Sequence, residues 1–294
     1  MDKKIAIVLD STTLESDILL NHPDVYWVPL NVIVDGKTYE DKTEMNEADL
    51  LKLLDEGKSA STSQPSVQKA IEIFREIKAK HYNHFFIFSI SSYLSGTLNT
   101  LAIGLKEAEI ESYDLIDTYT IAGPVAYIAE KVLDEIAAGT SCSKIRQHVQ
   151  DTIDSTSSYI LVENLERLIL SGRLNKTVGN LASAFKLKIL LTLKNKGESI
   201  DLFSIFRNDK KLHRTILDIL KQEKVNDKDY LIYLLEVDGL DKRMELESLI
   251  KQAYPELEIR YGTLPSVTVT HVGRGICGLQ LLKNNLNQTK KSTK

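Results

Sequence analysis

The sequence predicts an α/β protein of two domains: an N-terminal, mostly parallel sheet with flanking helices, and a smaller C-terminal α+β domain. Its 294 residues exceed one typical core and suit two domains of roughly 150 residues each. In the first half, apolar runs of strand length alternate with helical patterns, which is typical of βαβ units. The second half mixes a hairpin pattern with strands and helices. We therefore expect domains at 1–157 and 158–286, followed by a flexible tail at 287–294.

In the N-terminal half the strand and helix patterns follow one another closely. An Asp35-Gly36 turn should end the second strand, and Pro65 is expected at the first position of the second helix, where its missing N–H costs nothing. We predict strands at 5–9, 25–34, 85–90 and 113–116, and helices at 46–57, 66–80, 96–108 and 121–137.

In the C-terminal half the residues around Asn195 to Gly197 predict a hairpin turn. A glycine-rich run at 273–278 is interpreted as a tight turn before a last helix. We predict strands at 159–162, 189–193, 202–206, 230–237, 258–261 and 267–270, and helices at 143–155, 165–170, 210–221 and 241–253.

The composition excludes several classes of protein. With 43% hydrophobic and 27% charged residues, the chain is typical of globular proteins. A net charge of -4 gives no general attraction to nucleic acid or anionic membranes. No apolar stretch reaches the ~18–20 residues that span a bilayer, and the N-terminus lacks a signal-peptide pattern, so we expect a cytoplasmic protein without stable membrane insertion. Cys142 and Cys277 are too far apart in sequence for a zinc motif, so no metal is expected.

The first candidate site is the hydroxyl-rich run from Thr62 to Ser66. We expect it at the start of a helix, where hydroxyl groups and free backbone N–H groups form a receptor for a carboxylate or phosphate. Helix capping alone would also explain one of these hydroxyls.

The second candidate site runs from Ser91 to Thr97 and follows a predicted buried strand. Open α/β sheets bind ligands where a helix begins after such a strand. Ser95 brings a hydroxyl, and Gly96 lets a ligand approach the backbone closely. Because neither run brings a base, a metal cage or a phosphate-loop lysine, we expect a bound anion that is held rather than transformed.

Weaker signals lie in the second half of the chain. Gly273 to Gly278 formally matches a dinucleotide fingerprint, but it lacks the βαβ unit and the acidic residue that a true fingerprint needs. His271 could donate to an anion, carry a proton, or be purely structural. Arg173 and Arg207 are able to bind phosphate, yet a helix cap and a surface charge explain them equally well.

The order and spacing of these motifs, from about residue 3 to 283, resemble the DegV family of bacterial fatty-acid-binding proteins. Two positions depart from the family pattern: Tyr93 stands where glycine is usual, and Arg274 where a small residue or proline is usual. The matching motifs are Asp10-Ser11, Val28-Pro29-Leu30, Asp35-Gly36, Thr62-Ser63-Gln64-Pro65, Ser91-Ser92-x-Leu94-Ser95-Gly96-Thr97, Leu168-x-x-Ser171-Gly172-Arg173 and His271-x-Gly273-x-Gly275.

The resemblance implies a protein that holds one long-chain fatty acid of C14–C18, such as palmitate, without a cofactor. It also implies a partner, a separate ATP-binding kinase that converts the presented carboxylate to an acyl phosphate for phospholipid synthesis, so that the chain performs no turnover alone. By position, the carboxylate would be bound by Thr62 and Ser95, with Ser63, Gly96 and His271 near the head group and Arg173 and Arg207 serving phosphate handling or partner docking.

Three other classes stay open at this point. A serine hydrolase would use Ser95 as nucleophile and His271 as base, although no Gly-x-Ser-x-Gly elbow is present. A phosphate binder or kinase would use Arg173, Arg207 and the glycine-rich turn, without a phosphate-loop signature. A nucleic-acid module is disfavoured because the chain has an acidic balance and no basic, aromatic-rich stretch.

Overall fold

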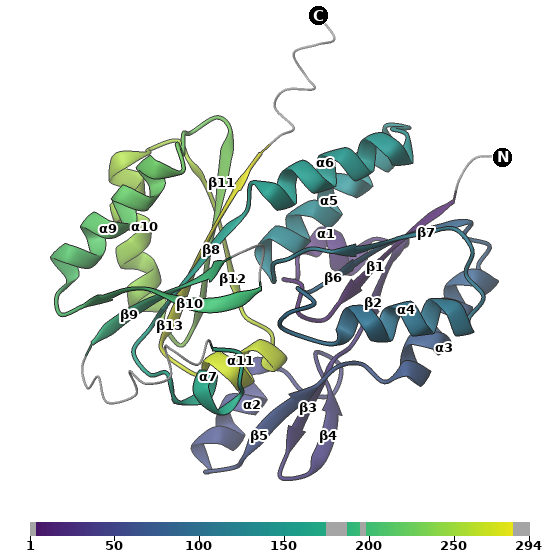
Figure 1. The fold of residues 1–294 in the computed structure, drawn as a ribbon, viewed down its shortest axis with the longest axis horizontal. Helices are drawn as coiled ribbons and strands as arrows, with labels where there is room; N and C mark the ends of the chain where they lie inside the picture. The colour runs from purple at the N-terminus through teal and green to yellow at the C-terminus, as the bar shows by residue number, and fades with distance from the viewer. Residues whose placement is uncertain (1–3, 175–186, 195–197, 285–294) are drawn as a thin grey trace, which may run out of the picture. The chain divides into compact units, whose positions relative to one another are not determined.

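The computed structural model describes residues 4–174, 187–194 and 198–284 (Figure 1). The chain divides into two compact units. The described part of unit 1 extends to Ile145 and adds Glu198 and Leu264–His271, whereas unit 2 contains the remaining described residues, from Arg146 onward. The expected hairpin turn at 195–197 and the expected tail at 287–294 lie outside the described residues.

A parallel four-stranded sheet forms the centre of unit 1, as the alternating pattern predicted. Its order is β2-β1-β6-β7, and every neighbouring pair is parallel. All six residues of β1 and all six of β6 are buried, because helices cover both faces of such a sheet. The strands are β1 (Ile5–Asp10), β2 (Val25–Val28), β6 (His84–Ser89) and β7 (Tyr113–Asp117).

One face of this sheet packs against α3 (Val67–Ala79) and α4 (Thr97–Glu107), which lie side by side (Figure 1). Phe74 of α3 is fully buried in the resulting core, which it shares with Phe85, ring to ring at 6.3 Å. A Cβ on Gly104 of α4 would lie 2.8 Å from the Cβ of Ala70, so the missing side chain lets the two helices approach closely. Unit 1 also contains the helices α1 (Asp17–Asn21), α2 (Glu47–Asp55) and α5 (Gly123–Ala137).

A second, antiparallel sheet in unit 1 corrects the prediction of one extended segment at 25–34. That segment forms two strands, β2 and β3 (Asn31–Val34), and they belong to different sheets. The chain leaves the first sheet at Pro29, which has no N–H to donate to a ladder. In the new sheet β3 pairs with β4 (Lys37–Glu40) and with β5 (Ala60–Ser63).

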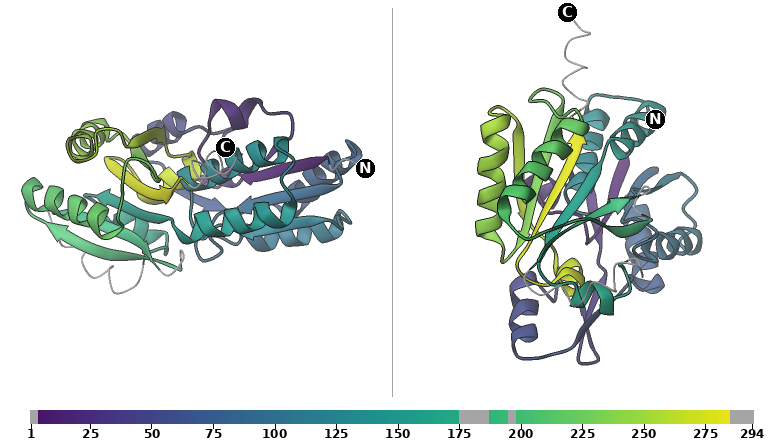
Figure 2. Two further views of the ribbon diagram at one scale, coloured as in Figure 1. Left: turned by 90° about the horizontal axis from the view of Figure 1, so that it is seen from above. Right: turned by 60° about the vertical axis from the view of Figure 1, so that its left-hand side comes forward.

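Unit 2 contains a mixed six-stranded sheet of order β10-β9-β8-β13-β11-β12. The expected hairpin is confirmed as the antiparallel pair β9–β10, and α9 and α10 lie side by side on one face (Figures 1 and 2). The predicted fold class, an α/β protein with a parallel sheet and a second mixed-sheet domain, is confirmed. The elements are β8 (Ser157–Val162), α7 (Glu166–Leu170), β9 (Lys188–Lys194), β10 (Ser199–Phe206), α9 (Asp209–Gln222), β11 (Tyr230–Val237), α10 (Leu240–Ala253) and β12 (Glu258–Thr263); α6 (Cys142–Asp154) contains the division between the units.

The last two predicted elements are wrong in type. Residues 267–270, expected as a strand, belong to the helix α11 (Ser266–Val272), and the expected last helix is the strand β13 (Ile276–Lys283). The alternation of Val and Thr favours a strand by propensity, but tertiary packing overrides that preference. In β13 seven successive residues are buried, because it pairs on both sides, with β8 and β11, so it lacks the polar alternation of an edge strand.

Candidate functional site

The hydroxyl groups of Thr62 and Ser63 lie at the end of β5, not at the start of a helix as predicted. Ser66 instead caps α3 by accepting from the backbone N–H of Lys69 at 3.1 Å, which also places Pro65 before the helix rather than at its first position. The Asn31 amide of β3 donates to the Ser63 hydroxyl and to the Gln64 carbonyl, each at 3.2 Å. The two hydroxyls are therefore held by strand pairing, and both side chains are partly exposed.

The Ser91–Thr97 run forms the loop between β6 and α4, as the sequence predicted. Gly96 is the N-cap of α4 and supplies no side-chain cap. The Ser95 hydroxyl accepts from the backbone N–H of Thr97 at 3.3 Å and lies 2.8 Å from the Thr97 hydroxyl. Ser95 is partly exposed, so its hydroxyl is oriented by Thr97 at the surface of the unit.

Asp10, at the end of β1, braces the start of this loop. Its Oδ2 accepts from the backbone N–H of Ile90 at 2.6 Å, and its Oδ1 accepts from the N–H and the hydroxyl of Thr12 at 2.9 and 2.5 Å. Burial raises the pKa of the Asp10 carboxyl, and these hydrogen bonds offset the effect only in part. Asp10 thus has a structural role, connecting the ends of two neighbouring strands under the loop.

Gln64 brings the two hydroxyl runs together, and the sequence reasoning missed this residue. A Cβ built on Gly96 would overlap the side-chain Oε1 of Gln64. The missing side chain at Gly96 therefore lets the Gln64 amide lie against the start of α4. The sequence signal for this contact is a glutamine in the first hydroxyl-rich run and a glycine in the second.

His271 completes the site from α11, at the end of a helix and not of the predicted strand. Its Nε2 lies 2.8 Å from the Thr62 hydroxyl, where either atom can be the donor. Thr62, Ser63, Ser95, Gly96 and His271 all belong to unit 1, and within this set the Thr62 hydroxyl contacts the His271 imidazole directly. We call these five residues the hydroxyl–imidazole cluster.

The pairing of these side chains does not support a serine hydrolase. Ser95 contacts Thr97, and the imidazole Nε2 of His271 contacts Thr62. A serine nucleophile and its histidine base lie within hydrogen-bond distance of each other or close to it, whereas here Ser95 and His271 each contact a different threonine hydroxyl. The Thr62 hydroxyl beside the His271 imidazole is a pair of hydrogen-bonding groups that suits the binding of an anion.

The remaining predicted residues lie elsewhere. Arg173 and Arg207 belong to unit 2; Arg173 donates to the Ser171 carbonyl at 2.6 Å, which completes the end of α7, and Arg207 is exposed after β10. Of the two departures from the family pattern, Tyr93 donates to Glu198 at 3.2 Å within unit 1, and Arg274 pairs with Asp238 at 2.8 Å within unit 2.

Within the described ranges, no three His, Cys, Asp or Glu side chains gather to hold a metal ion. No helix in the same part of the chain combines the length and apolar character needed to cross a membrane. The fold and the cluster together define a class: two-unit α/β proteins with a parallel sheet, a separate mixed sheet and a partly exposed cluster of hydroxyls.

A comparison with known families identifies the class. The family model described as "Uncharacterised protein, DegV family" matches residues 4–284. The chain therefore belongs to the DegV family, which confirms the resemblance of its motifs. Among relatives, the DegV domain-containing protein of Listeria innocua is 28% identical over 280 residues, which cover 95% of this chain and 98% of the relative.

Two solved structures share the fold. A fatty acid binding DegV family protein from Streptococcus agalactiae matches with a TM-score of 0.86 at 22% identity. A DegV family protein from Thermus thermophilus, described for its fatty acid binding, matches with a TM-score of 0.86 at 24% identity. Each match covers 95% of this chain and 99% of the other. At this level of identity the likeness establishes the fold.

Proposed function

We propose that the protein binds a single long-chain fatty acid, with the carboxylate held by the hydroxyls of Thr62 and Ser95 and the acyl chain buried. The observation that carries the proposal is the hydroxyl–imidazole cluster, which joins residues from β5, the β6–α4 loop and α11 in one unit. Ser63, Gly96 and His271 are the head-group neighbours. The likeness to the two fatty acid binding family members from Streptococcus agalactiae and Thermus thermophilus supports the same ligand class.

Neutral hydroxyls are sufficient for such a ligand because the acyl chain supplies the affinity. Burial contributes about 0.8 kcal/mol per methylene, or about 12 kcal/mol for a C16 chain before association costs are subtracted. The hydroxyl groups need only orient the head group. Hydroxyl donors satisfy carboxylate lone pairs without the strong pairing of a salt bridge, so the carboxylate stays available to react.

We further propose that the bound acid is presented to a separate ATP-dependent kinase, which forms the acyl phosphate. Arg173 and Arg207 are assigned to phosphate handling or to partner docking in this step. The loaded protein with ATP alone should then form no acyl phosphate, which hydroxylamine would trap as a hydroxamate. Accumulation of hydroxamate in that mixture would assign the turnover to this chain itself.

Native mass spectrometry of the protein purified from bacteria, followed by solvent extraction, tests the ligand class. We expect a one-to-one adduct whose extracted acid is C14–C18. A clean apo mass that stays unchanged after palmitate or oleate is added would refute fatty acid binding.

Gly96→Ala is predicted to weaken fatty acid binding more than it lowers stability. The new methyl group would displace the flexible Gln64 side chain, which costs little folding free energy but opens the junction between the two hydroxyl runs. Palmitate titration and urea unfolding measure the two effects. The control is Gly278→Ala, whose Cβ would make an ordinary 3.5 Å contact with Leu235; equal binding by both variants would contradict the role of the junction.

A further inference from the structure

The position of His271 depends on a short helix that carries its own anchor. α11 spans seven residues, and a helix of that length is unstable without tertiary contacts. Its N-terminal residue Ser266 is 1% exposed, and Val267 and Val269 are likewise buried. His271 lies at the opposite end of the helix, where its imidazole contacts Thr62. Whatever holds Ser266 therefore also sets the direction in which His271 points.

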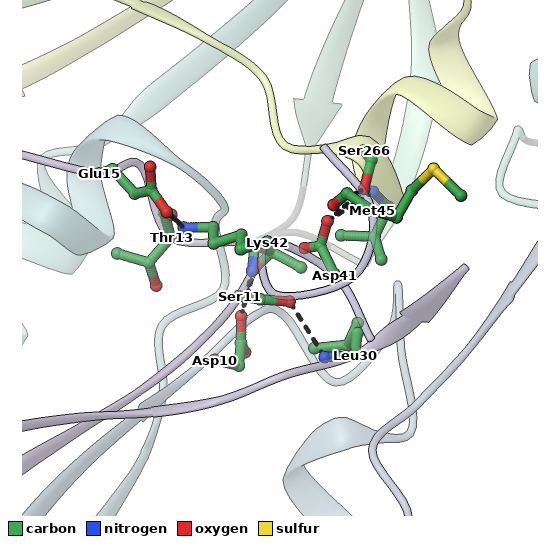
Figure 3. Close-up of polar contacts among 11 residues, drawn as sticks. Asp10, Ser11, Thr13, Glu15, Leu30, Asp41, Lys42, Met45 and Ser266 are labelled. Atoms are coloured by element: carbon green, nitrogen blue, oxygen red, sulfur yellow. Dashed lines mark hydrogen bonds and ion pairs between the residues drawn. The ribbon is translucent and has the colours of Figure 1, made fainter. Parts of the chain in front are cut away.

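Asp41 holds Ser266 (Figure 3). The Ser266 hydroxyl donates to Asp41 Oδ1, and the backbone N–H of Val267 donates to the same oxygen at 3.4 Å. The Ser266 hydroxyl also lies 3.3 Å from the carbonyl oxygen of Met45. Asp41 is 1% exposed, so a buried carboxylate accepts the hydrogen bonds from the hydroxyl and the N–H at the start of α11.

The turn that carries Asp41 is itself tied to the parallel sheet. The backbone N–H of Asp41 donates to the Leu30 carbonyl at 2.9 Å, and the Leu30 N–H donates to the Ser11 hydroxyl at 3.0 Å. The Lys42 ammonium donates to the Thr13 carbonyl at 2.7 Å and lies 4.2 Å from the centre of the Trp27 ring. Figure 3 shows Ser11, Leu30 and Lys42 beside Asp41, near the end of β1.

We propose that Asp41 and Ser266 are positioning residues for the proposed fatty acid site: their hydrogen bond fixes α11 and thereby holds the His271 imidazole against the Thr62 hydroxyl. The inference rests on the proposed function for its ligand, but not for its geometry. Neither residue touches the head group in this account. They act through α11, which they orient from the end opposite His271.

The chemistry of Asp41 indicates a conservative variant. Burial raises the pKa of its carboxyl, and hydrogen bonds from Ser266 and Ser11 offset that effect only in part. Oδ1 accepts both donors from α11, whereas the buried Oδ2 receives neither of them. Asp41→Asn can keep the accepting oxygen and place its amide nitrogen at the Oδ2 position, so it should preserve the anchor that Asp41→Ala removes.

The test records the imidazole ¹⁵N shifts of His271 in the ligand-free protein and the palmitate affinity of the same samples. Ser266→Ala and Asp41→Ala should move the His271 signals and weaken palmitate binding about tenfold, because the imidazole is no longer held at the site and about one hydrogen bond to the carboxylate is lost. The conservative variants Asp41→Asn and Ser266→Thr should keep the His271 signals and the palmitate affinity of the wild type. The matched control is Ser158→Ala, which removes a buried hydroxyl that Gln280 contacts at 3.0 Å in unit 2 and should move neither.

The two proposals fail in different ways. If the wild-type protein binds no palmitate, the proposed function is wrong, and the His271 shifts still decide the positioning role. If the wild type binds palmitate but folded Ser266→Ala keeps wild-type His271 signals and affinity, the positioning role is wrong. Loss of folding in Asp41→Ala leaves Ser266→Ala and Asp41→Asn to decide the question.

Discussion

The double variant Thr62→Val, Ser95→Ala is expected to bind palmitate at least about a hundredfold more weakly than the wild type, with the fold retained. Each hydroxyl donated to a carboxylate contributes about 1.5–3 kcal/mol, and a hundredfold corresponds to about 2.8 kcal/mol. Thr62→Val has the larger expected share, because it also removes the contact of His271 at 2.8 Å. Isothermal titration with palmitate, or displacement of a fluorescent fatty acid, measures the loss.

Thr38→Val is the matched control for that experiment. Thr38 is an exposed residue of β4, in the same antiparallel sheet as Thr62, so the change is chemically identical but lies outside the cluster. Its affinity should equal that of the wild type. Unchanged fatty acid occupancy in the double variant would show that other groups hold the carboxylate and would remove the basis of the site assignment.

Phe74→Ala is expected to have the largest effect on stability, a loss of about 3–5 kcal/mol, which is typical of a large buried ring whose cavity cannot collapse. Phe74 of α3 is fully buried in the core that this helix forms with α4 and the parallel sheet, where its ring lies edge-on to that of Phe85. Urea unfolding followed by the fluorescence of Trp27, the single tryptophan, reports on unit 1.

Tyr113→Ala serves as the comparison, since this aromatic residue of the same unit is 42% exposed and should cost about 1 kcal/mol or less. If the two variants unfold at the same urea concentration, Phe74 does not have the central role in the core that its burial indicates.

Sequence reasoning succeeded where a local pattern and the tertiary environment agree. Residues 66–80 were predicted as one helix, and α3 spans Val67–Ala79 with Ser66 as its cap. It failed where they disagree. Residues 267–270 have the composition of a strand, yet they form α11, because a buried carboxylate far away in the sequence receives the first donors of that helix.

The sequence by itself determined the parallel sheet, the second mixed sheet, the family, and the candidate site residues Thr62 and Ser95, which bear hydroxyls, and His271, which bears an imidazole. These follow from apolar periodicity and from motifs, which are local properties of the chain. Only the tertiary structure decided that Thr62 lies on a strand, that Gln64 packs against Gly96, and that Asp41 anchors the helix carrying His271. Those contacts join segments separated by as many as 226 positions, and their energies depend on burial and geometry that no local pattern encodes.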